Sequence, residues 1–146
     1  MALFRAMNIS ASALTAQRFR MDIISENLAN AEVTRTANGG PYRRRTVVMG
    51  QREDKTTFAE HLNGFQNSMI GNGVKVVQTD EDMSDFKMVY NPNHPDANAE
   101  GYVSYPNVDT VTEMVDLLSA SRSYEANITA FNTTKTMAMK ALELGK

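Results

Sequence analysis

The chain has 146 residues, the usual size of a single domain. Apolar residues make up 42% and charged residues 22%, which excludes a collagen-like or fully disordered chain. Fifteen Lys and Arg against seventeen Asp and Glu give a net charge of −2, which argues against nucleic-acid binding by bulk charge. The absence of Cys excludes disulfides and thiolate metal sites. No apolar run is long enough to span a membrane, and residues 1–30 lack the apolar core of a secretory signal peptide.

The N-terminal segment, up to about residue 31, contains neither Pro nor Gly and predicts a helix over residues 4–30. Large apolar residues recur there every seven positions, a spacing typical of helices that pair with other helices. An amphipathic helix packed on an ordinary core is the alternative interpretation. The stripe comprises Met7, Leu14, Met21 and Leu28.

The middle of the chain contains all four Pro and all Gly but one. β-prone runs bounded by turn residues predict four short strands, at 42–49, 74–79, 86–90 and 102–105. Residues 57–67 fit a short helix or a loop. So few short strands can bury only a small core.

The C-terminal segment, from about residue 108 to 144, again lacks Pro and Gly and predicts a helix over 110–144. Thr110 and Glu113 have the spacing of a capping box, and Lys140 suits the negative end of the helix dipole. Alternating steps of three and four residues run along the segment and indicate a coiled-coil stripe. Its members are Met114, Leu117, Ser121, Tyr124, Ile128, Phe131, Lys135, Ala138 and Leu142.

No residue pattern indicates an enzyme. His61 and His94 have no second ligand at metal-binding spacing, and no Ser lies in a nucleophile elbow. The turn 71–73 lacks the rest of a dinucleotide fingerprint, and the acidic residues 80–85 lack the Gly and Glu of a calcium loop. We therefore predict no catalytic residue, cofactor, metal or small-molecule substrate. The basic run 43–45 is interpreted as a charged strand edge, with contact to an acidic partner as the alternative.

The two stripes indicate a subunit of an assembly. One chain buries too little apolar surface along two such helices to offset the entropy of ordering them. We therefore expect the helices to be stable mainly when further chains cover their remaining faces. We also expect an isolated monomer to be ordered only in part of residues 33–107.

Short motifs at both ends resemble those of the bacterial flagellar axial proteins, and the middle segment 90–103 resembles their proximal-rod members. The resemblance covers essentially the whole chain. The N-terminal motif comprises Asn27, Leu28, Ala29, Asn30 and Ala31, and the C-terminal motif comprises Tyr124, Glu125, Ala126 and Asn127.

The predicted fold is α+β, with long N- and C-terminal helices pairing as a coiled coil and a small β-rich middle domain. Residues 1–32 and 108–146 would form a helical assembly domain, and residues 33–107 an outer domain. The resemblance implies a structural rod subunit in the periplasmic part of the flagellum, exported without a cleaved signal peptide. Its implied partners are copies of itself, other rod proteins and the flagellar export apparatus.

Two other classes stay open at this stage. One is an enzyme such as a periplasmic cell-wall hydrolase. The other is a coiled-coil binding module such as an export chaperone.

Overall fold

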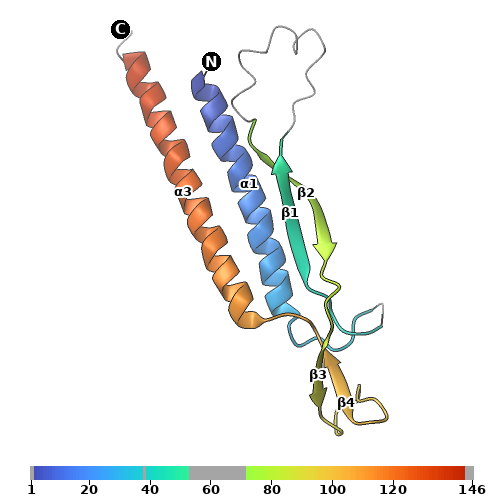
Figure 1. Cartoon of the computed structure of the whole chain (residues 1–146). Helices are drawn as coiled ribbons and strands as arrows, with labels where there is room; N and C mark the ends of the chain where they lie inside the picture. Colours follow the sequence, from blue (N-terminus) through green and yellow to red (C-terminus); the bar gives the residue numbers. More distant parts are fainter. Residues whose placement is uncertain (1, 38, 53–71, 144–146) are drawn as a thin grey trace, which may run out of the picture.

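The computed structural model describes residues 2–37, 39–52 and 72–143. Two long helices, α1 (Ala2–Ala29) and α3 (Thr110–Glu143), pack against each other with the chain termini at the same end (Figure 1). Between them come the strands β1 (Arg45–Gln51), β2 (Val74–Glu81), β3 (Lys87–Tyr90) and β4 (Tyr102–Tyr105). The α+β prediction, with helical ends and a β-rich middle, is therefore confirmed. The predicted segment 57–67 lies outside the described residues.

The start of α3 differs from its prediction. Asp109 caps the helix, because its carboxylate accepts the Val111 N–H at 3.1 Å and the Thr112 hydroxyl at 2.8 Å. The predicted capping box of Thr110 and Glu113 is wrong. The Glu113 side chain lies fully buried against other elements instead of bonding back to the cap.

The strands form two separate antiparallel pairs. β1 pairs with β2 from Arg45 opposite Glu81 to Gln51 opposite Val74, with an irregularity between Val48 and Met49. β3 pairs with β4, and this hairpin lies beyond the start of α3 (Figure 1). The first strand begins later than predicted because Tyr42, which is 9% exposed as a residue, turns inward before it.

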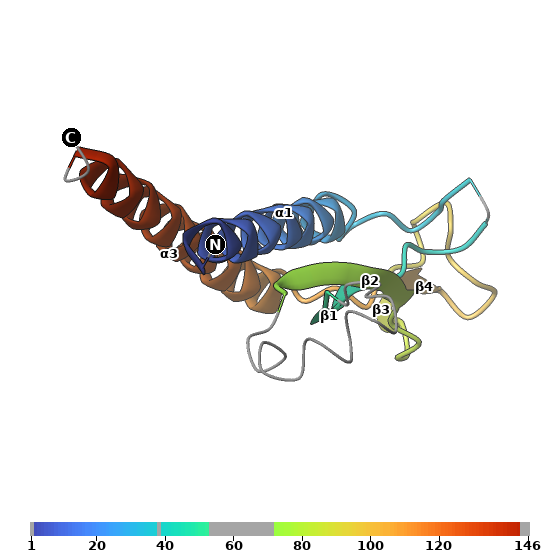
Figure 2. The same ribbon diagram turned by 90° about the horizontal axis from the view of Figure 1, so that it is seen from above.

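The β1–β2 pair packs along α1 (Figure 2), and residues of α1, β1 and the first turns of α3 line one common groove. Ser12 fastens the beginning of β2 to the helix, since its hydroxyl accepts the Val74 N–H at 3.1 Å and donates to the Ile9 carbonyl at 2.7 Å. Gly73 has a φ of 98°, and a Cβ on it would collide with the Ser12 hydroxyl. The close approach of strand and helix therefore depends on glycine at this position.

The apolar core is small. Few described side chains are buried, and they lie on α1, α3, β4 and the segments before β1 and after β4, the last of which contributes Pro106. Much of the apolar surface of α3 consequently stays exposed. The buried apolar residues are Ala16, Ile24, Tyr42, Val103 and Ala120.

Candidate assembly site

Two polar contacts set the antiparallel register of the helix pair. Arg20 on α1 meets Asp116 on α3 at 3.3 Å, and Asn27 donates to Glu113 at 3.0 Å. One helical turn from the Arg20–Asp116 pair, in the direction of the chain termini, lie Ala16 on α1 and Ala120 on α3. They are 2% and 0% exposed. Small side chains at this level let the two helices approach closely.

The face of α3 with the least exposure follows alternating steps of four and three residues. This spacing is that of a helix packed lengthwise against another helix. From Glu113 to Thr134, its polar or small members alternate with larger apolar or aromatic ones. The face comprises Glu113, Leu117, Ala120, Tyr124, Asn127, Phe131, Thr134 and Ala138.

The predicted stripe of α3 coincides with this face at every second position. Leu117, Tyr124, Phe131 and Ala138 belong to both. The alternate positions differ: Met114, Ile128 and Leu142 are 52%, 37% and 75% exposed, and Lys135 is also exposed. Ser121 is half-buried. The contact with α1 uses the residue one position earlier, because Glu113 finds polar partners there and Ala120 permits close packing.

The predicted stripe of α1 is half-buried along its length. Met7, Leu14, Met21 and Leu28 all have intermediate exposure, on a helix that packs against both α3 and the β1–β2 pair. The predicted pairing of the two terminal helices is thus present within a single chain. Their coiled-coil geometry stays a prediction.

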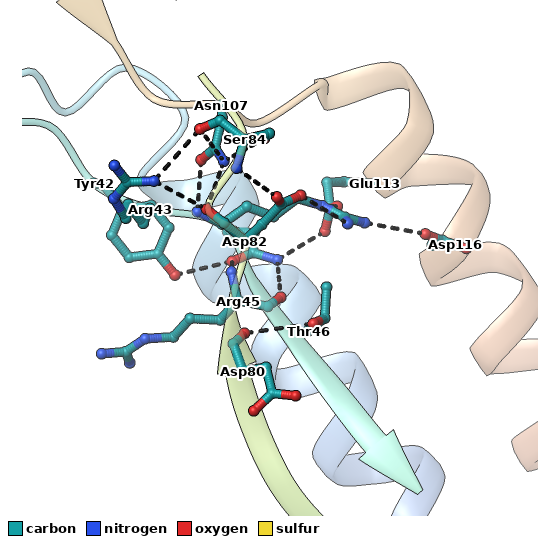
Figure 3. A network of polar contacts seen from close by, with 12 residues as sticks. Tyr42, Arg43, Arg45, Thr46, Asp80, Asp82, Ser84, Asn107, Glu113 and Asp116 are labelled. Carbon is teal, nitrogen blue, oxygen red and sulfur yellow. Dashed lines mark hydrogen bonds and ion pairs between the residues drawn. The ribbon is translucent and has the colours of Figure 1, made fainter. Parts of the chain in front are cut away.

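A buried polar cluster joins α1, α3 and β1 at the end of the helix pair opposite the chain termini (Figure 3). At its centre, Asn27 is 1% exposed and Glu113 is fully buried. The Asn27 amide donates to the Arg45 carbonyl at 2.8 Å and to Glu113 at 3.0 Å. Its oxygen accepts the Tyr42 hydroxyl and the Arg45 N–H, each at 2.9 Å. All four hydrogen-bonding positions of this buried amide are therefore filled.

Arg44 neutralises the buried carboxylate. Its Nε donates to Glu113 at 2.6 Å, and its terminal nitrogens lie 3.6 Å from Asp116 and 3.9 Å from Asp82. A buried charge is tolerated only when it is paired and hydrogen-bonded, and Glu113 meets both conditions. The Arg44 backbone is held as well, since its N–H donates to Asn107 at 2.9 Å.

The neighbouring arginines also bind within the chain. Arg45 pairs with Glu26 at 3.0 Å, and the Arg43 guanidinium stacks 4.3 Å from the centre of the Phe86 ring. The run 43–45 thus makes specific contacts within the chain, and Arg45 also opens the edge strand β1. The acidic groups that this run meets belong to the chain itself, because the fold brings Glu26, Glu113 and Asp116 to the start of β1.

The acidic segment 80–85 also forms hydrogen bonds within the chain. The Asp82 carboxylate accepts the Ser84 N–H at 2.9 Å, and this hydrogen bond holds the pKa of Asp82 below its usual range. The Asp82 carbonyl accepts the side-chain amide of Asn107 at 2.9 Å. The cluster therefore extends from α1 and α3 to the loop after β2.

Two further pKa values report the same local structure. Burial, together with nearby Glu26, raises the pKa of Tyr42, so its hydroxyl stays a donor to Asn27. Hydrogen bonds from Thr112 and Val111 hold the pKa of Asp109 below its usual range. Among the described residues, no three His, Asp or Glu side chains gather so as to hold a metal ion. The contacts of the cluster join α1, α3 and the start of β1, so the arrangement positions these elements relative to one another.

The two predicted family motifs lie at different depths. Asn27 is at the centre of the polar cluster, and Asn30 closes α1 by donating to the Glu26 carbonyl at 2.8 Å. Tyr124 and Asn127 lie on the face of α3 with the least exposure. The other motif members divide between half-buried positions, Leu28 and Ala31, and exposed positions, Ala29, Glu125 and Ala126.

Pattern analysis missed Glu113 and Arg44 as structural partners. Glu113 has the spacing of a capping residue, and Arg44 lies in a run of like charges, so local rules explain both without long-range contact. The one available signal is that Glu113 falls four residues before Leu117, on the same side of the helix. The sequence contains no comparable indication that its partners are Asn27 and Arg44.

Comparisons with known proteins place both helices in recognised families. Residues 7–35 match the family described as flagella basal body rod protein. Residues 99–144 match the family described as flagellar basal body rod FlgEFG protein C-terminal. The first match contains Asn27, and the second contains Glu113.

Similarity to individual proteins extends over the full chain. A flagellar basal-body rod protein FlgC of Bacillus subtilis (strain 168) is 55% identical, with all of both chains covered. The chain belongs to the FlgC family of flagellar basal-body rod proteins. The FlgC of Borreliella burgdorferi is 42% identical over 99% of this chain and 98% of its own, and that of Salmonella typhimurium is 42% identical over all of both. The expected resemblance to axial proteins of the rod is confirmed, and FlgC is the family within it.

Proposed function

We propose that the chain is a structural subunit of the flagellar basal-body rod, in its proximal part, where it assembles helically and transmits motor torque. The observation that carries the proposal is the full-length identity of 55% to a protein named as a basal-body rod protein. The form of the molecule supports it. Two long helices lie side by side and leave large apolar side chains exposed, as a subunit does before its neighbours cover them.

In this proposal, residues 1–32 and 108–146 form the inner, assembling part and residues 33–107 the outer part. The exposed members of the α3 stripe, Met114, Ile128 and Leu142, contact other chains. The half-buried members contribute to the helix pair and to its rims. These half-buried residues are Met7, Leu14, Met21, Leu28, Leu117, Tyr124, Phe131 and Ala138.

The polar cluster couples the outer part to the inner part. Arg44 and Arg45 belong to the entry of β1, whereas Asn27 and Glu113 belong to the helices. A second attachment lies near the other end of β1–β2, where Ser12 holds Val74 and Arg5 holds Asn72 at 2.7 Å. Two separated attachments prevent the strand pair from pivoting on α1, which suits a subunit that carries torque.

The proposed partners are copies of the chain, other rod proteins and the flagellar export apparatus. The proposed location is the periplasmic part of the basal body, reached without a cleaved signal peptide. No helix among the described residues is both long and apolar enough to cross a membrane. The proposal includes no catalytic step, cofactor or small-molecule substrate.

Replacement of the resident FlgC of Bacillus subtilis by this chain tests the proposal. We expect rods to assemble, the chain to purify with basal bodies, and cells to swim at least in part. The matched control expresses the resident protein from the same site. A chain that is produced stably but remains in the cytoplasm, with no rods formed, would contradict the proposed function.

A further inference from the structure

The attachment of β2 to α1 contains an Asn–Gly pair. The sequence has three such pairs, at 38–39, 63–64 and 72–73, and only the last lies wholly within the described residues. The backbone nitrogen that follows an Asn can attack the carbonyl carbon of the Asn side chain and close a succinimide ring. Glycine favours this attack because it has no Cβ to obstruct the approach. The surroundings of Asn72 and Gly73 therefore decide whether the folded chain permits the reaction.

Hydrogen bonds hold the pair on both sides but leave its two reacting nitrogens unoccupied. The Asn72 side-chain oxygen accepts a hydrogen bond from Arg5 at 2.7 Å, and the Gly73 carbonyl accepts the Arg52 N–H at 2.9 Å. Neither the Asn72 side-chain nitrogen nor the Gly73 N–H donates to another described residue. Arg5 thus binds the oxygen that stays in the ring, and not the nitrogen that leaves. Both residues are half-buried, so water reaches them.

The other pair whose glycine is described differs at the attacking nitrogen. The Gly39 N–H donates to the Thr36 carbonyl at 3.0 Å. That hydrogen bond holds the Gly39 nitrogen in place, whereas the Gly73 nitrogen has no such restraint among the described residues. The contacts therefore favour the reaction at 72–73.

We propose that Asn72 and Gly73 form a site of spontaneous covalent modification in the folded chain. The Gly73 nitrogen bonds to the carbonyl carbon of the Asn72 side chain and gives its proton to water. The bond from that carbon to the side-chain nitrogen breaks, and ammonia leaves. Water then opens the succinimide at either of its carbonyl carbons. One opening leaves an aspartate at position 72, and the other leaves an isoaspartate, in which the main chain runs through the former side chain.

The two products affect the attachment differently. An aspartate leaves the main chain unchanged and presents a carboxylate oxygen to Arg5, so that contact is retained as an ion pair. An isoaspartate adds one carbon to the main chain directly before Gly73. Gly73 has no room to move towards the helix, because a Cβ on it would already collide with the Ser12 hydroxyl. The added length therefore displaces the start of β2 and breaks the 3.1 Å hydrogen bond from the Val74 N–H to Ser12.

This modification goes beyond the proposed function. Isoaspartate at position 72 releases one of the two attachments between the strand pair and α1. The other attachment, the polar cluster around Asn27 and Glu113, involves none of the altered atoms. The chain thus carries a slow chemical change that loosens the strand pair at one end only.

Ageing of the full-length chain tests the site. Wild-type chain is kept folded at neutral pH, beside a sample unfolded in urea. Chymotrypsin cleaves after Phe65 and so separates residue 72 from the pair at 63–64, and fragment-ion spectra locate the converted residue. We expect Asn72 to lose its amide in the folded chain and both products to accumulate. Asn72→Gln is the matched control, because glutamine keeps the amide but closes its larger ring far more slowly.

Amide hydrogen exchange read at single residues measures the effect on the attachment. We expect the Val74 N–H to exchange at least ~10-fold faster in the isoaspartate form, because its hydrogen bond to Ser12 is lost. A fresh Asn72→Asp variant should exchange at the wild-type rate. Isoaspartate methyltransferase with S-adenosylmethionine returns isoaspartate through the succinimide to aspartate, so this treatment should restore the slower exchange.

Two results would overturn the inference. One is a folded chain that keeps the Asn72 amide over the period in which the urea-unfolded chain converts. The other is an isoaspartate form whose Val74 N–H exchanges at the wild-type rate. Neither result bears on the rod function, which the replacement experiment in Bacillus subtilis tests independently.

Discussion

Glu113 shows how one residue can determine the geometry of the whole chain. Its carboxylate is fully buried, where a charge without partners would be strongly unfavourable. Both of its oxygens are bonded, one to Arg44 at 2.6 Å and the other to Asn27 at 3.0 Å. Asn27 in turn holds Tyr42 and Arg45. One side chain of α3 thus fixes α1 and the start of β1 together.

Replacement of Glu113 should therefore destabilise the fold more than its position on a helix suggests. We expect Glu113→Ala to lower the free energy of unfolding by about 3–5 kcal/mol, because it leaves partners of a buried ion pair unsatisfied. Glu113→Gln, which keeps the shape and loses the charge, should cost about 1–3 kcal/mol. Urea unfolding followed by circular dichroism measures both.

Glu125→Gln is the matched control, since Glu125 is exposed on the same helix. Its effect should stay below about 0.5 kcal/mol. Equal urea midpoints for Glu113→Ala and Glu125→Gln would show that the polar cluster contributes nothing to stability.

At the scale of elements, α3 has one face that packs within the chain and exposed apolar residues elsewhere. One face packs on α1 and mixes small, polar and aromatic residues, while large apolar side chains lie exposed elsewhere on the helix. The helix also bonds much of its own backbone through side chains. Several hydroxyls donate to the carbonyl four residues earlier, an arrangement that slightly weakens a helix. These residues are Ser123, Thr129, Thr133, Thr134 and Thr136.

A substitution at Phe131 tests the packing role of the α3 face that has the least exposure. It is half-buried at a position shared by the predicted and the observed stripe. Phe131→Asp would place a carboxylate in an apolar contact with no described partner, so we expect an expressed and exported subunit that fails to assemble. Rod formation and swimming in cells with the variant as their only copy provide the measurement.

Glu143→Gln serves as the comparison, because Glu143 is exposed at the end of α3 and its change should cost less than about 0.5 kcal/mol. If cells carrying Phe131→Asp swim like those carrying Glu143→Gln, the packing role of this face is refuted.

In the whole molecule, the buried contacts between α1 and α3 are distributed unevenly along the helices. The polar cluster and the buried Ala16 and Ala120 lie towards the end of the helix pair opposite the chain termini, whereas the described residues of the two helices near the termini are half-buried or exposed. The hydroxyl-rich part of α3 lies in its second half, towards the C-terminus. Local unfolding is easiest where buried contacts are fewest, so the stability of the helix pair should decrease from the polar cluster towards the chain termini.

Amide hydrogen exchange of the dilute chain measures this gradient. We expect the slowest exchange in residues 16–27 and 113–120 and the fastest in 2–8 and 136–143. The purely sequence-based expectation is fast exchange throughout both helices. Uniformly fast exchange would therefore favour that expectation over the structural one, and uniformly slow exchange would contradict both.

The sequence by itself determined the elements and the family. Helical ends follow from long segments without Pro or Gly, the β-rich middle follows from its turn residues, and the motifs around Asn27 and Tyr124 indicate axial proteins. These features depend on residues close together in the chain, so they can be recognised from the sequence alone. Even so, periodicity chose Met114 and Ile128 over Glu113 and Asn127, because a hydrophobicity pattern favours large apolar residues.

Only the tertiary structure decided which face of α3 meets α1 and what the charged runs do. Glu113, Asn27 and Arg44 are far apart along the chain, and nothing local to any of them specifies the other two. A buried carboxylate becomes favourable only when chain topology brings its donors within hydrogen-bonding distance, and that distance is a property of the folded chain. The same long-range packing decides which large apolar side chains of α3, such as Met114 and Leu142, stay exposed.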